Sequence, residues 1–123
     1  MNFGGPIETG VFVQQVSVSM SYPGIIRGMH SHKKQWDFWY LLQGSVWVQI
    51  YYVGPDPVDE YHYEFFLNGN NGYMLTIPPG WAHGYKVLNN NPCMMLYGVS
   101  EIYNGSNPDE VKHGETMDGL ITW

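Results

Sequence analysis

The chain has 123 residues, enough for one domain with a buried core and too few for two. Only 13% of its residues are charged and 16% are aromatic, and its 15 glycines and 8 prolines favour short strands and turns over long helices. The net charge of −6 argues against nucleic acid or an anionic membrane as a general partner.

Apolar and polar residues alternate along most of the chain, a pattern that is typical of half-buried β-strands. In chain order we expect strands over residues 16–20, 25–32, 36–42, 45–53, 61–67, 73–77, 81–88 and 93–103. Turns that contain glycine or proline separate them. Short strands at regular spacing predict an all-β sandwich or barrel, in which closure removes exposed sheet edges.

The single cysteine, Cys93, lies in an apolar run, and we interpret it as a small core side chain that excludes an internal disulfide. The first residues lack the character of a signal peptide, and no apolar stretch is long enough to span a membrane. We therefore expect a soluble cytoplasmic protein.

One predicted strand is apolar on both faces. Phe38, Tyr40 and Leu42 share one face, while Trp39 and Leu41 share the other. Only one face can point into a barrel, so a second layer must cover the other. Because the chain has little length left to form that layer, we expect a homodimer.

Four side chains have the chemistry of a metal site. His30 and His32 are two residues apart, hence on the same face of a strand. Asp37 starts the next strand, and His83 follows a Pro-Pro-Gly corner much later. Three imidazoles and a carboxylate suit divalent Fe, Mn, Ni or Zn and leave coordination positions open for water or substrate. Taken singly, each could be an ordinary core, surface or turn residue.

The spacing of these residues resembles the two motifs of the cupin superfamily. The segment Gly24-x5-His30-Ser31-His32-x4-Asp37-x6-Gly44 resembles the first motif, with Asp37 where the family usually has Glu. The segment Gly72-x5-Pro78-Pro79-Gly80-x2-His83 resembles the second, although Val87 stands where the family's final Asn would fall. The resemblance implies a single double-stranded β-helix (jelly-roll) barrel over residues 1–123, with metal ligands at His30, His32, Asp37 and His83.

Within that superfamily, two segments resemble the dTDP-4-dehydrorhamnose 3,5-epimerases: Ile26-Arg27-Gly28-Met29-His30 and Ile77-Pro78-Pro79-Gly80-Trp81-Ala82-His83-Gly84-Tyr85, followed by Leu96-Tyr97. The resemblance implies His30 as general base, Tyr97 as acid and Arg27 as a contact to nucleotide phosphate. Because Tyr97 shares strand parity with Cys93 and Met95, a core aromatic is the alternative for it. The family's enolate-stabilising lysine aligns with Asp37, which reverses the charge. The family's aspartate that pairs with the base lies in a C-terminal segment that we expect this chain to lack.

These departures point in one direction. A metal-bound His30 has its lone pair occupied and cannot also act as a base. A divalent ion can, however, polarise a carbonyl and stabilise an enolate. We therefore interpret the chain as an epimerase-like scaffold in which metal chemistry replaces the lysine and the His–Asp pair.

The basic residues concentrate around the two motifs, which favours an anionic ligand; they are Arg27, Lys33, Lys34 and Lys86. A solvated loop explains Lys33 and Lys34 equally well. Trp39 and Trp81 adjoin the predicted ligands and could stack on a sugar or base, with core packing as the alternative. The predicted substrate-binding residues are therefore Arg27, Trp39, Trp81 and Lys86.

Three functions fit these residues. The first is a metal-dependent isomerase or epimerase of a small anionic keto compound, such as a nucleotide-linked keto sugar. The second is an Fe- or Mn-dependent dioxygenase that uses the same three-histidine, one-carboxylate site. The third is a non-catalytic sugar- or metabolite-binding barrel. Iron content and oxygen uptake separate the second from the first, and deuterium exchange into a keto sugar separates the first from the third.

Overall fold

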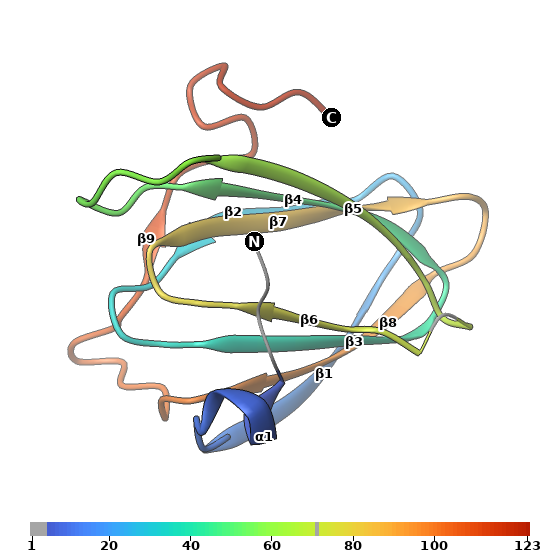
Figure 1. Ribbon diagram of the computed structural model, residues 1–123. Helices are drawn as coiled ribbons and strands as arrows, with labels where there is room; N and C mark the ends of the chain where they lie inside the picture. The colour runs from blue at the N-terminus through green and yellow to red at the C-terminus, as the bar shows by residue number, and fades with distance from the viewer. Residues whose placement is uncertain (1–4, 71) are drawn as a thin grey trace.

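A computed structural model describes residues 5–70 and 72–123 and shows two antiparallel sheets that face each other (Figure 1). A short helix, α1 (Pro6–Thr9), precedes the strands β1 (Gln15–Ser21), β2 (Ile26–Ser31), β3 (Asp37–Gln43), β4 (Ser45–Tyr52), β5 (His62–Asn68), β6 (Met74–Ile77), β7 (Trp81–Leu88), β8 (Cys93–Val99) and β9 (Val111–Lys112). The four-stranded sheet has the order β1-β8-β3-β6 and the five-stranded sheet the order β5-β4-β7-β2-β9. The predicted all-β jelly roll is confirmed.

The eight predicted strands all form, and β7 has the predicted bounds. The largest difference from the predicted bounds is at β8, which ends at Val99 and not at residue 103. Residues 100–110 leave the four-stranded sheet, and the chain then pairs with β2 as β9. Neither β9 nor α1 was predicted, since two and four residues are too short for a periodic pattern. No helix among residues 5–70 and 72–123 is long and apolar enough to cross a membrane.

The core lies between the two sheets and is built from side chains that alternate inward. Val46, Val48 and Ile50 of β4 face Leu41 of β3 and Met95 of β8 in one cluster of buried side chains. Burying each such side chain contributes roughly 1.5–3 kcal/mol. Polar side chains replace apolar ones on the inner face of β2 and at the start of β3, and the interior there opens into a cavity.

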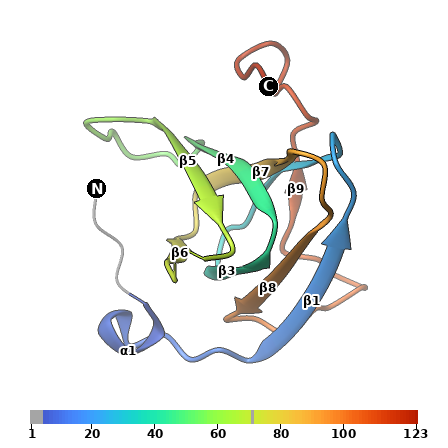
Figure 2. The same cartoon turned by 90° about the vertical axis from the view of Figure 1, so that its right-hand side faces the viewer.

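The C-terminal segment covers the outer face of the five-stranded sheet (Figures 1 and 2). Met117 and Ile121 from this segment are buried against Met29 and Ala82 of the sheet. The buried amide of Gln49 donates a hydrogen bond of 2.8 Å to the carbonyl oxygen of Thr122, which fixes the end of the chain. This face of the barrel is thus closed by the chain itself.

The outer face of the four-stranded sheet is covered only in part. Phe38, one of the three residues from which a homodimer was predicted, is 3% exposed in a single chain, so the prediction that it needs a second subunit is wrong. Val13, from the segment that follows α1, lies against Gly98, the residue paired with Phe38. Leu42, by contrast, stays 43% exposed.

Candidate active site

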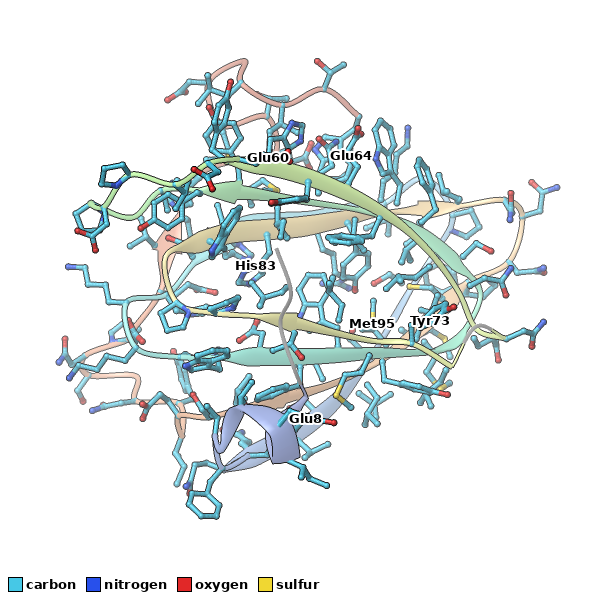
Figure 3. All side chains as sticks on the ribbon, in the orientation of Figure 1. Glu8, Glu60, Glu64, Tyr73, His83 and Met95 are labelled. Carbon is cyan, nitrogen blue, oxygen red and sulfur yellow. The ribbon has the colours of Figure 1, made fainter. Side chains whose placement is uncertain are left out.

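A cavity of about 260 Å³ between the sheets contains most of the predicted site residues. Its lining includes Arg27, His30, His32, Asp37, Trp39, His83 and Tyr97. Figure 3 shows His83 in the space between the sheets. A larger surface hollow of about 770 Å³ adjoins this cavity and shares His32 and Tyr97 with it.

Three of the four predicted metal ligands come together at one point of this cavity. The Nε2 atom of His83 lies 3.1 Å from Oδ2 of Asp37, and the Nε2 atom of His32 lies 4.0 Å from the same oxygen. The ligand atoms of the three residues all lie within 4.8 Å of one another. Asp37 and His83 are buried, and the rings of His32 and His83 stack with centroids 5.3 Å apart.

The hydrogen bonds of the two imidazoles decide which ring nitrogen faces Asp37 with a lone pair. Nδ1 of His83 lies 3.0 Å from the carbonyl oxygen of Trp81, and Nδ1 of His32 contacts the carbonyl oxygen of Asp109. A carbonyl oxygen only accepts, so both Nδ1 atoms carry hydrogen. The Nε2 lone pair of His83 then points toward the carboxylate over 3.1 Å, and two such acceptors need a cation between them. The Nε2 atom of His32 lies farther from the carboxylate, at 4.0 Å, and is 3.4 Å from the side-chain amide nitrogen of Gln35. That cation is either an extra proton on an imidazole or a metal ion, and histidines that bind metals have this same hydrogen-bond arrangement.

The carboxyl group of Asp37 favours its ionised form, which binds either cation. Burial raises the pKa of this carboxyl, but the hydrogen bond and the charge of His83, with smaller effects of His32 and Gln35, bring it below its ordinary value. The side-chain amide of Gln35 donates to Oδ1 of Asp37 over 2.7 Å and leaves Oδ2 for the cation. The donor set of two imidazoles and one ionised carboxylate therefore fits a divalent ion.

His30, the fourth predicted ligand, is not part of this cluster. Its Nδ1 atom lies 3.7 Å from Oε1 of Glu110, in a pair of which each side chain is more than one-third exposed. Burial lowers the pKa of His30, and the neighbouring charge of Glu110 offsets only part of that effect. The imidazole of His30 is therefore neutral at pH 7, with a carboxylate beside it that the sequence analysis did not anticipate.

A bulge in β2 places both Arg27 and His30 in the cavity. These residues are three apart, so regular alternation would send them to opposite faces. Arg27 pairs with Tyr85 of β7 and His30 with His83, which leaves one extra residue on β2. Gly28 lies in this bulge at φ +144°, and a Cβ atom there would lie 2.6 Å from the Cα atom of Gly84. Only glycine fits this approach.

Tyr97 and Trp39 form the wall opposite β2. Both lie on inner faces of the four-stranded sheet, where they pair across β8 and β3. The indole of Trp39 meets the rings of His83 and Tyr85 edge-on, at 5.3 and 5.5 Å between centroids. Tyr97 thus faces the cavity from the sheet opposite the one that carries His30.

Two predicted substrate-binding residues do not line the cavity. The ring of Trp81 is buried against Tyr52 and Tyr63, so its indole belongs to the core, and only its carbonyl oxygen serves the site. Lys86 lies between Tyr85 and Val87 on β7, both of them core residues of the inner face, so alternation sends its side chain outward. Neither side chain lines the cavity, and their contact with substrate stays a prediction.

Sequence reasoning missed Gln35, Asp109 and Glu110. Asp109 accepts backbone hydrogen bonds at the entrance of the site, and these hold the pKa of its carboxyl below the ordinary value although burial raises it. The two acidic residues come next to each other more than seventy residues after the motif they contact. Only the pairing of β9 with β2 brings them to the site, and a two-residue strand gives no sequence signal.

The chain is similar to known proteins of one family. The family model described as dTDP-4-dehydrorhamnose 3,5-epimerase matches residues 5–122. The spore coat polysaccharide biosynthesis protein SpsL of Bacillus subtilis is 37% identical over 97 residues, which cover 78% of this chain and 64% of SpsL. The probable low-salt glycan biosynthesis epimerase Agl13 of Haloferax volcanii is 30% identical over 94 residues, which cover 75% of this chain and 60% of Agl13.

Solved structures agree with the family match. The crystal structure of dTDP-4-dehydrorhamnose 3,5-epimerase from Bacillus anthracis, with TDP and PPi bound, has a TM-score of 0.76 and 26% sequence identity. The match covers 86% of this chain and 63% of that one. The chain thus spans less than two thirds of the length of these relatives.

Proposed function

Because the chain belongs to the dTDP-4-dehydrorhamnose 3,5-epimerase family, which has the cupin fold, we propose that it epimerises a nucleotide-linked keto sugar. The observation that carries this proposal is the position of His30 and Tyr97 on opposite walls of one cavity. The name of Agl13 as an epimerase and the TDP bound to the B. anthracis enzyme support the substrate class.

Epimerisation beside a carbonyl needs a base on one face of the carbon and an acid on the other. His30 projects from β2 of the five-stranded sheet and Tyr97 from β8 of the four-stranded sheet. With Nδ1 of His30 directed at Glu110, Nε2 remains to accept the proton. Because the pKa of His30 is lowered by burial, its imidazole is neutral at pH 7 and able to act as that base. Tyr97 would return a proton from the other wall.

Loss of that proton places negative charge on the carbonyl oxygen of the substrate, and this charge must be stabilised. We assign this task to the cluster of His32, Asp37 and His83, with Asp37 at the position of the family's lysine. A divalent ion held there would supply Lewis acidity to the carbonyl oxygen. Since His30 lies outside the cluster, its lone pair remains free, and one cavity can contain both a metal site and a base.

Arg27 is the proposed contact for the nucleotide phosphates. Its Nε atom donates to Oγ of Ser21 over 2.5 Å, which leaves its terminal amino groups for an anion. A guanidinium held in one orientation suits bidentate recognition of phosphate. Trp39 lies in the same cavity and is the proposed surface for the sugar.

The direct test is proton exchange with solvent. When dTDP-4-keto-6-deoxyglucose is incubated with the metal-loaded protein in D₂O, the carbon beside the carbonyl should exchange its hydrogen for deuterium only in the presence of the protein. NMR of the sugar measures this exchange. Tyr97→Phe should uncouple exchange from epimerisation, since it removes the acid and leaves the base. Absence of exchange with the wild-type protein would favour a non-catalytic binding barrel. Oxygen consumption by the iron-loaded protein would instead favour the dioxygenase.

We also propose that the protein is a homodimer that uses the outer face of the four-stranded sheet. Val16, Val18 and Met20 of β1 remain 60%, 54% and 48% exposed. Light scattering should give twice the chain mass of 14.1 kDa, and Val18→Glu should shift it toward one chain. Val58→Glu, at an exposed valine in the loop after β4, is the matched control. A wild-type mass near 14.1 kDa would contradict the dimer.

The cytoplasmic location stays a prediction.

A further inference from the structure

The loop over residues 32–36, between β2 and β3, carries part of the site but belongs to no strand. Two distant side chains hold its backbone: Ser100 accepts the N–H of Trp36 over 2.8 Å, and Asp109 accepts three others. Oδ1 of Asp109 accepts the backbone N–H of Lys33 over 2.8 Å, and Oδ2 accepts those of Lys34 and Gln35 over 2.9 and 3.0 Å. Three successive backbone N–H groups that converge on one carboxylate form an anion-binding nest, and this nest is filled by the protein's own side chain.

The same residue reaches the candidate metal cluster by two routes. Its main-chain carbonyl oxygen accepts the Nδ1–H of His32, which turns the Nε2 lone pair of that ring toward Asp37. Its carboxylate fixes the backbone of Gln35, whose side-chain amide donates to Oδ1 of Asp37 over 2.7 Å. Asp109 is not one of the three clustered residues.

The position of Asp109 is fixed in turn by the sheet. It lies two residues before β9, and β9 pairs with the end of β2 through Ser31 opposite Val111. The pairing brings the two segments together in register, so the carbonyl and the carboxylate of Asp109 face the loop together. A residue held by strand pairing can impose an orientation on a loop that has no strand pairing of its own.

From this geometry we propose that Asp109 is a positioning residue that sets the orientation of His32 and of the Gln35–Asp37 pair, and that it thereby controls the affinity of the cluster for a divalent ion. The effect of Asp109 on metal affinity rests on the proposed function, in which the cluster binds a divalent ion. Residues that orient metal ligands through such contacts typically change metal affinity by about 10–100-fold when they are replaced.

The first test is a titration with Co²⁺ alone, followed by calorimetry and by the visible absorption of the bound ion. Asp109→Asn keeps the size of the side chain but cannot accept all three N–H bonds, and it should raise the Kd for Co²⁺ about 10–100-fold. Asp56→Asn, at an exposed aspartate in the loop after β4, is the matched control and should leave the Kd unchanged. Equal Kd values for the wild type and Asp109→Asn would overturn the proposal.

The second test needs no metal. The ¹⁵N spectrum of the imidazoles should show His32 of the wild type with hydrogen on Nδ1. Asp109→Asn keeps the main-chain carbonyl oxygen but loosens the loop that carries His32, so it should give a mixture of tautomers while backbone signals outside this loop and residue 109 stay unchanged. Gln35→Leu removes the second route and also the 3.4 Å contact of the Gln35 amide with Nε2 of His32. It should weaken Co²⁺ binding and leave the His32 tautomer intact, because Nδ1 keeps the carbonyl oxygen of Asp109. An unchanged tautomer in Asp109→Asn would overturn the proposal. A wild type that binds no Co²⁺ but shows the tautomer change would instead reject the metal function and retain Asp109 as the residue that orients His32.

Discussion

His32 and His83 are held in the cavity by more contacts than His30. His32 and His83 each give Nδ1 to a carbonyl oxygen and direct Nε2 at the buried Asp37. Nδ1 of His30 lies 3.7 Å from a carboxylate that is itself partly exposed. A fixed set of lone pairs suits an ion that stays bound, while a base must reach substrate and exchange protons with solvent. The difference supports the separate tasks that we propose for residues that the sequence places in one motif.

His30 also lies on a different strand from Asp37 and His83, although two neighbouring residues just before β9 contact both groups of histidines: Asp109 contacts His32, and Glu110 contacts His30. Asp37 and His83 lie on β3 and β7, in the middle of opposite sheets. His30 takes its direction from the bulge in β2 and its partner from the segment just before β9. Substitutions should therefore separate the two tasks, with loss of metal and loss of proton transfer occurring independently.

The largest effect is expected from Asp37→Lys. A cation at this position repels a divalent ion and removes the only carboxylate of the cluster, so bound metal should fall to background. The fold should persist because the barrel is closed by strand pairing. Elemental analysis of protein reconstituted with metal, with circular dichroism as the check on folding, measures both. Metal content equal to that of the wild type would show that Asp37 is not a ligand.

Replacement of His30 should affect the other task. His30→Gln removes the base but none of the three clustered side chains, so kcat/KM should fall by about 10²–10⁴ while metal content stays at the wild-type level. The rate of epimerisation and the metal content are measured on the same preparation. Loss of metal together with activity would place His30 among the ligands, as the sequence motif predicted, and would abolish the separation of tasks.

A smaller effect is expected from Glu110→Gln. His30 is neutral at pH 7, and even a charged pair this exposed contributes only about 0.2–1 kcal/mol, so kcat/KM at neutral pH should change by no more than about fivefold. The charge of Glu110 raises the pKa of His30, and its removal should lower that pKa further. The base then stays neutral to lower pH, so the acid limb of the pH–kcat/KM profile should move to lower pH. An acid limb that does not move would show that Glu110 does not act on the base.

Much of the fold and part of the site can be predicted from the sequence. Strand alternation gave the eight main strands, because each buries one face and repeats every two residues. The motif spacing identified His32, Asp37 and His83, because regular strands carry them to one point. Both predictions depend on local periodicity, which a single sequence records well.

The features of the site that the sequence did not reveal depend on contacts that periodicity does not encode. A bulge in β2 gives the strand one extra residue and changes the direction of the side chains around Gly28. Glu110 reaches His30 through the pairing of a two-residue strand and the hydrogen bonds of residues 113 and 114 with Met29. Trp81 adjoins a ligand in sequence, yet its ring packs into the core. Neighbours in sequence therefore proved a poor guide to neighbours in the cavity.

The smallest effect is expected from Asp37→Glu, the residue usual in the superfamily motif. The side chain gains one methylene in a buried position, which in a close-packed core costs about 1–3 kcal/mol. Here the carboxylate borders a cavity of about 260 Å³, so the extra length can be accommodated without displacing core side chains.

Metal binding by Asp37→Glu should therefore be preserved or tightened, and we expect a Kd for Co²⁺ no weaker than that of the wild type. Competition with a chelator of known affinity measures the ratio, and thermal unfolding of the apoprotein shows the cost of the methylene separately. Because Gln35 donates to Oδ1 of Asp37 over 2.7 Å, Glu must keep this bond to hold its carboxylate in place. If Asp37→Glu loses metal as completely as Asp37→Lys, the cluster needs the short side chain itself, and a match of carboxylate chemistry is not enough.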